Sequence, residues 1–344
     1  MVSTHPRGGG RTAANRPEHS RLKKTDAQKV RKGLQRRNHR RYRAFLRHGR
    51  GRFYRLLTEL VEGAEAPYRC RPYGTPGRPP TNPRDVARFL LLKNFEGWSY
   101  DETYATLEAL PELARKLGFR KTVPAASTVA MLVTKVPTRY LEDLLARTTV
   151  HLVRGRTNVA GDATGVATRR YPRWFDVRHG RKGRRRAFIK LHTIVATRAE
   201  WPFFLSARVT RGTRNDAPEL ELLLDQMDPS IELGNGAFDR GYQSRKNAQL
   251  IEDRGGFPVI DLKKNATAKA LGHPAWRRMV HRQRTDRRAF RCRYRRRPVV
   301  EGVFGGFKRR FGEILLARRR HAQRVEILCR VVVWNLLGMV YHKK

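Results

Sequence analysis

The order in which helical and strand patterns follow one another constrains the fold of this chain more than any other feature. Three β-rich runs follow a helical region, at residues 158–168, 188–197 and 203–210. From residue 218 onward the two patterns alternate. The expected elements are helices at 218–224, 244–253 and 298–315 and strands at 231–238 and 257–262. Three successive strands followed by alternating helices and strands predict an α/β fold with a mixed sheet flanked by helices.

Charge indicates the class of partner. The chain has 75 Lys and Arg against 30 Asp and Glu, for a formal net charge of +45. A folded chain with this charge repels itself unless a polyanion neutralises it, which makes nucleic acid the expected partner. Binding should weaken steeply with salt, because phosphate contacts release counterions. An anionic membrane surface is the alternative polyanion, but no long apolar segment accompanies the charge, so we expect no membrane partner.

Cysteine usage and the N-terminal segment indicate the compartment. Cys70, Cys292 and Cys329 are far apart and fit neither a zinc pattern nor a disulfide framework. The basic N-terminus lacks the apolar stretch of a secretory signal. We therefore expect a cytoplasmic protein.

The region before the strands carries helical signals. The Asn-Pro pair at 82–83 supplies a cap and a proline at the first helical position, and Ser99 with Glu102 matches a capping box. Several short helices joined by turns are compatible with a helix-turn-helix unit. We therefore predict an N-terminal all-helical DNA-binding domain at 53–153.

The rest of the chain is expected to divide as follows. Residues 1–52 are basic with few apolar anchors, which is typical of a flexible arm, either a solvated tail or a DNA-contacting segment. Residues 154–344 form the α/β domain. Within it, residues 264–296 include much of an arginine-rich stretch, and we predict a small basic insertion there, a cationic flap laid along DNA.

Three carboxylates are hard to explain in so cationic a chain. Asp162 interrupts an apolar β-run, Asp239 follows a short strand, and Glu301 stands in a strongly cationic stretch. A buried carboxylate is costly unless it is paired or metal-bound, and ligand groups gather at the carboxyl ends of strands. Structural alternatives stay open for both aspartates, a turn position for Asp162 and an ion pair with Arg240 for Asp239. Glu301 alternatively offsets neighbouring arginines.

The helical pattern that carries Glu301 adds geometry. Its apolar positions form one face, and Glu301 and Lys308, seven residues apart, lie together on the border of that face. Each glycine inside a helix costs about 1 kcal/mol relative to alanine. Three glycines follow Glu301: Gly302, Gly305 and Gly306. Their number suggests that a backbone or a ligand approaches the helix closely.

Binding of divalent metal ions is a function that all three carboxylates could share. Two strand-borne aspartates and a helix-borne glutamate can converge on a pair of Mg²⁺ ions, which prefer oxygen ligands and keep positions open for phosphate and water. With ions roughly 4 Å apart, one activates the attacking oxygen and the other stabilises the leaving oxygen. We therefore predict that Asp162, Asp239 and Glu301 are metal ligands and catalytic residues. Their spacing allows strand, strand and helix placement in a ribonuclease-H-like fold.

At this point the residues resemble those of the DDE transposases of bacterial and archaeal insertion sequences. Tyr294, Arg297, Glu301 and Lys308 are separated by two, three and six residues, which matches the family's Tyr-Arg-Glu-Lys signature. The resemblance covers roughly residues 80–340.

The two aspartates extend the resemblance. Asp162, within Gly-Asp-Ala-Thr-Gly, looks like the family's first catalytic aspartate. Asp239, within Asp-Arg-Gly-Tyr-Gln-Ser, looks like the second, although Gln243 stands where the family commonly has aspartate.

The resemblance implies hydrolysis of double-stranded DNA at the element's ends, followed by attack of the freed 3′-hydroxyl on target DNA. The three carboxylates would hold two Mg²⁺ ions, with Mn²⁺ as a substitute. Arg297 and Lys308 would contact phosphate, which arginine grips bidentately and lysine binds as a point charge, and Tyr294 would position the strand. Because two element ends must be paired, the resemblance also implies a homodimer on DNA. A bacterial or archaeal transposase is expected to be cytoplasmic and associated with the nucleoid.

Further DNA contacts are predicted from local composition. Arg184 and Arg185 belong to a basic loop between two of the expected strands. Trp276 lies beside Arg277 and Arg278 and is a candidate to stack on a base, with a core position as the alternative.

Other functions remain open at the level of the sequence. A non-catalytic DNA-binding protein derived from a transposase, and a metal-dependent nuclease without strand transfer, would both carry this charge. A ribosomal or RNA-packaging protein would too, but would leave the acidic triad unexplained.

Overall fold

The computed structural model describes residues 43, 48–71, 76, 79–120, 122–153, 155–168, 188–197 and 201–342. The chain divides into two compact units, residues 1–50 and 51–344. Nearly all of the predicted arm at 1–52 lies outside the described residues, as do Arg184 and Arg185.

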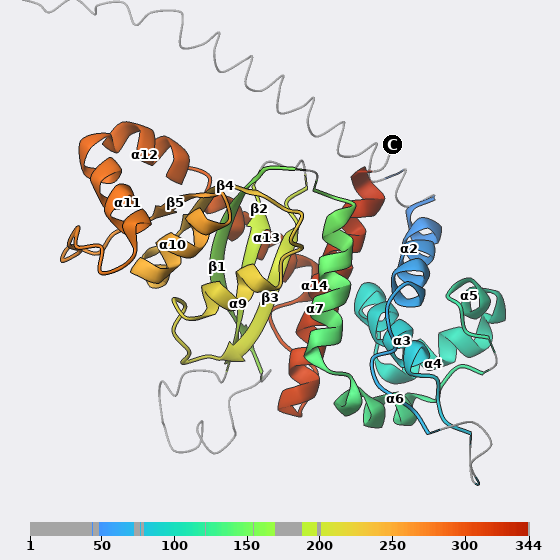
Figure 1. The fold of residues 1–344 in the computed structure, drawn as a ribbon. Coiled ribbons are helices and arrows are strands. Elements are labelled where there is room, and N and C mark those ends of the chain that lie inside the picture. The colour runs from blue at the N-terminus through green and yellow to red at the C-terminus, as the bar shows by residue number, and fades with distance from the viewer. Residues whose placement is uncertain are drawn as a thin grey trace, which may run out of the picture. The chain divides into compact units, whose positions relative to one another are not determined.

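A five-stranded mixed sheet forms the centre of the second unit (Figure 1). Its strands are β1 (Thr157–Ala167), β2 (Phe188–Ala196), β3 (Phe204–Arg211), β4 (Leu233–Phe238) and β5 (Phe257–Ile260). The order across the sheet is β3-β2-β1-β4-β5. Strands β1, β2 and β3 pair antiparallel, whereas β4 runs parallel to both β1 and β5. The mixed sheet flanked by helices confirms the predicted α/β class and fits a ribonuclease-H-like domain.

The pairing of β1 with β4 depends on one close approach. Gly161 is the register partner of Phe238. A Cβ atom added to Gly161 would lie 2.1 Å from Cε1 of the Phe238 ring, so no larger residue fits without displacing that ring. This register places the next residues of the two strands, Asp162 and Asp239, side by side.

Helices cover both faces of the sheet. Successive side chains of β3 point to opposite faces, so neighbouring residues of this strand contact different helices. Leu205 belongs to a core shared with the helices α9 (Glu219–Asp225), α10 (Arg245–Asp253) and α11 (Pro274–Thr285). Phe204 points the other way, with its ring centroid 5.6 Å from that of Phe307 on α13 (Pro298–Phe311).

The C-terminal helix α14 (Arg320–His342) packs along β3 and α7. Two polar residues interrupt its largely apolar sequence, and both have partners. The side chain of Asn335 accepts a hydrogen bond from the N–H of Phe204 and donates one to the carbonyl of Phe204. Arg330 forms an ion pair with Glu326. None of the described helices is long and apolar enough to cross a membrane.

The N-terminal part of the second unit is helical, as predicted. Its elements are α2 (Arg50–Glu62), α3 (Pro83–Glu96), α4 (Tyr100–Ala109), α5 (Pro111–Lys116), α6 (Ala126–Leu132), the 3₁₀ turn η2 (Val133–Lys135) and α7 (Thr138–Val150). Asn82 caps α3, and Ser99 with Glu102 forms the predicted capping box of α4. Because α3 packs on α14 and α7 packs on β3, these helices share one compact unit with the sheet.

Two segments of the sequence prediction can be compared with the structure. Residues 264–296, predicted to be a small basic insertion laid along DNA, include α11 and α12 (Arg287–Tyr294), which bury Met279, Val280 and Phe290 in the core. The helix predicted to run to residue 315 ends earlier, at Phe311. Gly312 follows with φ 80°, a left-handed conformation that favours glycine and ends the helix.

Candidate active site

The three predicted carboxylates meet around a single guanidinium group. Asp162 lies in β1, Asp239 directly follows β4, and Glu301 is in the first turn of α13. Nη2 of Arg297 lies 2.8 Å from Oδ2 of Asp162 and 3.9 Å from Oδ2 of Asp239. Nη1 of Arg297 contacts Oε1 of Glu301. Residues far apart in the sequence are therefore gathered by one cation.

The structure excludes the structural alternatives proposed for the two aspartates and retains the one proposed for Glu301. Asp162 lies within a strand, opposite Thr193, and not in a turn. Asp239 does not pair with Arg240, whose Nε lies 2.6 Å from Asp261. Glu301 does neutralise a neighbouring arginine, but that arginine, Arg297, also contacts Asp162.

Asp162 has the most perturbed environment of the three carboxylates. Burial raises its pKa from 3.8 to about 6, although the N–H of Ala163, which donates to Oδ1, and the charge of Arg297 act in the opposite direction. The side chain of Asp162 is 16% exposed, whereas that of Glu301 is 57% exposed. Asp239 is held by the N–H of Gly241, 2.9 Å from its Oδ1. The site thus has a buried side, formed by Asp162, and an open side, formed by Glu301.

The donor set suits a hard divalent cation, because carboxylate oxygens are the ligands that Mg²⁺ and Mn²⁺ prefer. The guanidinium of Arg297 already occupies the space between the carboxylates as a cation. Within the described part of the chain, no three His, Cys, Asp or Glu side chains stand close enough to hold a metal ion as they are. A metal ion would therefore have to replace Arg297 among the carboxylates.

The other predicted site residues have different surroundings. Tyr294, at the end of α12, is half-buried against the core, and burial raises its pKa. Lys308 is half-buried on α13. The predicted stacking of Trp276 on a base is wrong. Its side chain is 2% exposed, and its indole N–H donates to the carbonyl of Thr267. The apolar face of α11 turns the ring into the core, so it is not available to stack on a base.

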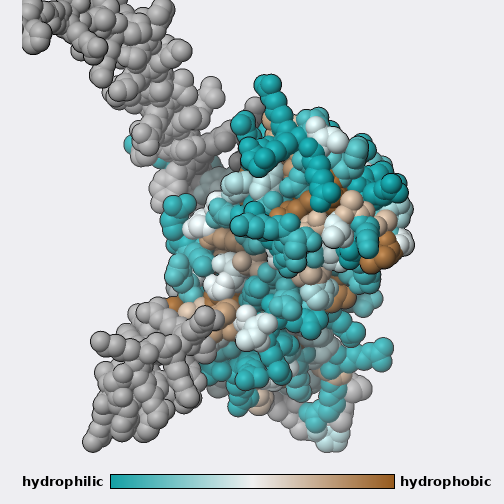
Figure 2. Space-filling model, turned by 90° about the vertical axis from the view of Figure 1, so that its left-hand side faces the viewer, coloured by the Kyte–Doolittle hydropathy of each residue, from teal (hydrophilic) through white to brown (hydrophobic). Residues whose placement is uncertain are grey.

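A cationic hollow lies beside Tyr294. It has a volume of about 240 Å³ and is lined by Arg240, Asp261, Gln283, Arg287, Phe290, Arg291 and Tyr294. Further exposed arginines occupy α11 and α12, and the surface seen from that side of the molecule is mostly hydrophilic (Figure 2). This combination suits a phosphate-rich partner.

Sequence reasoning did not identify a second polar cluster beside the first. Asp216 lies 2.6 Å from Nζ of Lys190 and 3.2 Å from Nδ1 of His192, which is fully buried. A Cβ atom on Gly241 would lie 2.9 Å from Oδ2 of Asp216 and 3.0 Å from Oδ1 of Asp239, so the two carboxylates are neighbours. The one feature of the sequence that could have indicated this cluster is the placement of Lys190 and His192 on the same face of a predicted strand.

Comparison with known proteins agrees with this geometry. A family model described as a transposase DDE domain matches residues 154–336, just over half of the chain. The chain belongs to the DDE transposase family. The matched span includes all three carboxylates and Arg297. No curated protein and no solved structure gave a match.

The glycines beside Glu301 in this transposase fall into two kinds. A Cβ atom on Gly306 would lie 2.9 Å from Cη2 of Trp334, so this glycine permits α13 to pack on α14. A Cβ atom on Gly302 or Gly305 would meet nothing within 4 Å among the described residues. Packing within the described residues therefore explains Gly306 but does not explain Gly302 or Gly305.

A pair of substitutions tests this distinction. Gly302→Ala is expected to stabilise the protein by about 1 kcal/mol, because alanine favours the helix and has open space. Gly306→Ala is expected to destabilise it through contact with Trp334. Urea unfolding measures both. If DNA approaches Gly302, the stabilised variant should also bind DNA more weakly than the wild type; destabilisation by Gly302→Ala would contradict the open space.

Proposed function

We propose that this transposase cuts double-stranded DNA at the ends of a mobile element and joins the freed 3′ ends to target DNA. The observation that carries the proposal is the convergence of Asp162, Asp239 and Glu301 on one cation where the strand β4 ends. The net charge of +45 supports a polyanionic substrate.

Asp162, Asp239 and Glu301 would hold two Mg²⁺ ions, or Mn²⁺ in their place. Metal ions bound there would activate the attacking oxygen and neutralise charge on the leaving oxygen. Asp162 contributes by remaining ionised in a buried position, which requires a nearby positive charge. Glu301, on the open side, meets the substrate first.

The remaining signature residues would act on the DNA strand. Arg297, released from the carboxylates, would pair bidentately with a phosphate. Lys308 lies seven residues from Glu301, on the same side of α13, and would bind a more distant phosphate as a point charge. Tyr294, next to the cationic hollow, would position the strand near the cleavage site.

DNA binding outside the catalytic residues is assigned to three parts of the chain. The helices at 53–153 would bind element ends, and the basic residues at 1–52 and at Arg184 and Arg185 would add phosphate contacts. Two chains would act together on paired ends, as a homodimer on DNA.

The test uses supercoiled DNA that carries candidate element ends. Full-length protein is incubated with this DNA in Mg²⁺ or in EDTA, beside Glu301→Gln and the control Glu313→Gln, an exposed carboxylate beyond the end of α13. We expect joined products only in Mg²⁺, and only from the wild type and the control.

Each other outcome identifies an alternative. Nicked or linear products without joining would indicate a nuclease without strand transfer. DNA binding with no metal-dependent product would indicate a non-catalytic DNA-binding protein. Joining by Glu301→Gln at the wild-type rate would remove Glu301 from the catalytic residues.

A further inference from the structure

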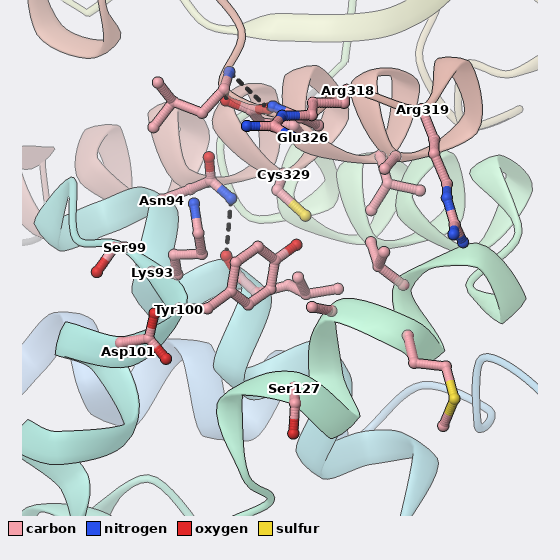
Figure 3. Close-up of a pocket in the computed structure, with 18 residues that line it drawn as sticks. Lys93, Asn94, Ser99, Tyr100, Asp101, Ser127, Arg318, Arg319, Glu326 and Cys329 are labelled. Carbon is pink, nitrogen blue, oxygen red and sulfur yellow. Dashed lines mark hydrogen bonds between the residues drawn. The ribbon is translucent and has the colours of Figure 1, made fainter.

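A groove of about 680 Å³ lies away from the carboxylates, between α3, α4 and α6 on one side and α14 on the other (Figure 3). Its apolar lining includes Leu90, Val133 and Val325. Two side chains on its rim are unusually exposed for their type, Met131 at 63% and Leu316 at 62%. Cavities of this size and lining are typical of small-molecule sites.

Lys93 supplies a buried charge to this groove. It is 6% exposed and points toward the space beside Tyr100, whose ring centroid lies 4.9 Å from Nζ (Figure 3). Within the described part of the chain, the Tyr100 ring is the contact of Nζ of Lys93, which has no hydrogen-bond acceptor and no carboxylate within 4 Å. Burial lowers the pKa of Lys93. An ammonium group removed from water in this way is costly unless an anion reaches it.

The nearby carboxylates are engaged elsewhere. Glu326 accepts hydrogen bonds from the N–H groups of Leu316 and Ala317 and pairs with Arg330. Glu102 is bound to the N–H of Ser99 in the capping box. Both carboxylates favour the charged form of Lys93 from a distance, but neither contacts its Nζ among the described residues.

The rim of the groove also favours an anion. Arg318 and Arg319 are exposed there, against a single rim carboxylate, Asp101. The apolar lining distinguishes the expected ligand from a DNA backbone, which offers no apolar surface to cover it. The required chemistry is therefore an anionic head group on an apolar body.

We propose that this groove binds a small organic carboxylate, whose head group pairs with Lys93 and whose apolar part covers the lining between Met131 and Leu316. The site is independent of the proposed strand transfer. It contacts α3 and α6 together with residues 316–319, which connect α13 to α14. A bound ligand would therefore join the helical region to the connection that follows the Glu301 helix.

Three probes with the same hydrocarbon chain test the proposal: octanoate, octan-1-ol and octylamine. Each is titrated into full-length protein by calorimetry at high salt, which suppresses binding to surface arginines. We expect saturable one-to-one binding of octanoate, at least about tenfold tighter than octan-1-ol, with octylamine weakest. Lys93→Met should remove this tenfold preference and leave octan-1-ol binding unchanged. Lys116→Met, an exposed lysine on α5, is the matched control and should behave as wild type.

A second variant keeps the test decisive if Lys93→Met does not fold. Ala130→Trp, at an exposed position on α6 that lines the groove, should block both octanoate and octan-1-ol. The proposal is overturned if the wild type does not bind octanoate, if octanoate and octan-1-ol bind equally, or if neither Lys93→Met nor Ala130→Trp weakens octanoate binding. DNA cleavage by the wild type bears on none of these outcomes.

Discussion

An Arg297→Gln protein is expected to bind Mn²⁺ roughly tenfold more tightly than the wild type in the absence of DNA, and to cleave DNA about 10³-fold or more slowly. The two effects have opposite signs because Arg297 has two partners. Without DNA it pairs with Asp162 and Glu301, so a metal ion must displace it. With DNA it would contact phosphate, where an arginine contributes to the transition state.

Mn²⁺ titration followed by electron paramagnetic resonance measures the first effect, and cleavage of labelled DNA measures the second. Arg296→Gln is the matched control, since Arg296 is adjacent, exposed and carries the same charge. It should leave Mn²⁺ binding within experimental error of the wild type. Weaker Mn²⁺ binding by Arg297→Gln would contradict the prediction and would mean that Arg297 organises the carboxylates for metal.

An Asp162→Asn protein is expected to lose cleavage by about 10³-fold or more, yet to unfold less easily than the wild type at neutral pH without metal. Burial raises the pKa of Asp162 from 3.8 to about 6. Between these values the folded protein binds more protons than the unfolded chain, so wild-type stability falls as pH rises through this window. Asparagine carries no charge and avoids the loss, on the order of 1–3 kcal/mol above pH 6.

Urea unfolding in EDTA at pH 4, 5, 6 and 7.5 measures this difference. The two proteins should have similar free energies of unfolding near pH 4, and the advantage of Asp162→Asn should grow as pH increases. A less stable Asp162→Asn protein at pH 7.5 would show that the ion pair with Arg297 outweighs the cost of burying the carboxylate.

Much of the sheet was predictable from the sequence because its signal is local. The β1 strand was expected at 158–168 and occupies Thr157–Ala167, since alternating and β-branched residues set strand positions over short distances. Caps such as Ser99 with Glu102 were predictable for the same reason. The end of α13 could not be predicted from the apolar pattern, because that pattern continues beyond Gly312, whose positive φ ends the helix.

The sequence predicted that the three carboxylates would lie close together, but it did not predict that they would share Arg297 as a partner. Asp162, Asp239 and Glu301 stood out as acidic residues in a basic chain, yet the contact of Arg297 with all of them depends on how α13 packs against β1. Trp276 was assigned to DNA from its basic neighbours, whereas helix geometry turns Trp276 inward while those neighbours stay exposed. Spatial clusters such as Asp216 with His192 are equally invisible to local patterns, because their members lie on different elements.

The close approach of Gly161 to Phe238 has a consequence for how the family diverges. A methyl group gained at position 161 would collide with the ring, so evolution can enlarge this position only after position 238 has become smaller. The two positions should therefore covary among relatives, with small and large residues exchanged between neighbouring strands. Since each position immediately precedes one of the two aspartates, this coupled pair limits the substitutions by which this part of β1 and β4 can change while Asp162 and Asp239 stay aligned.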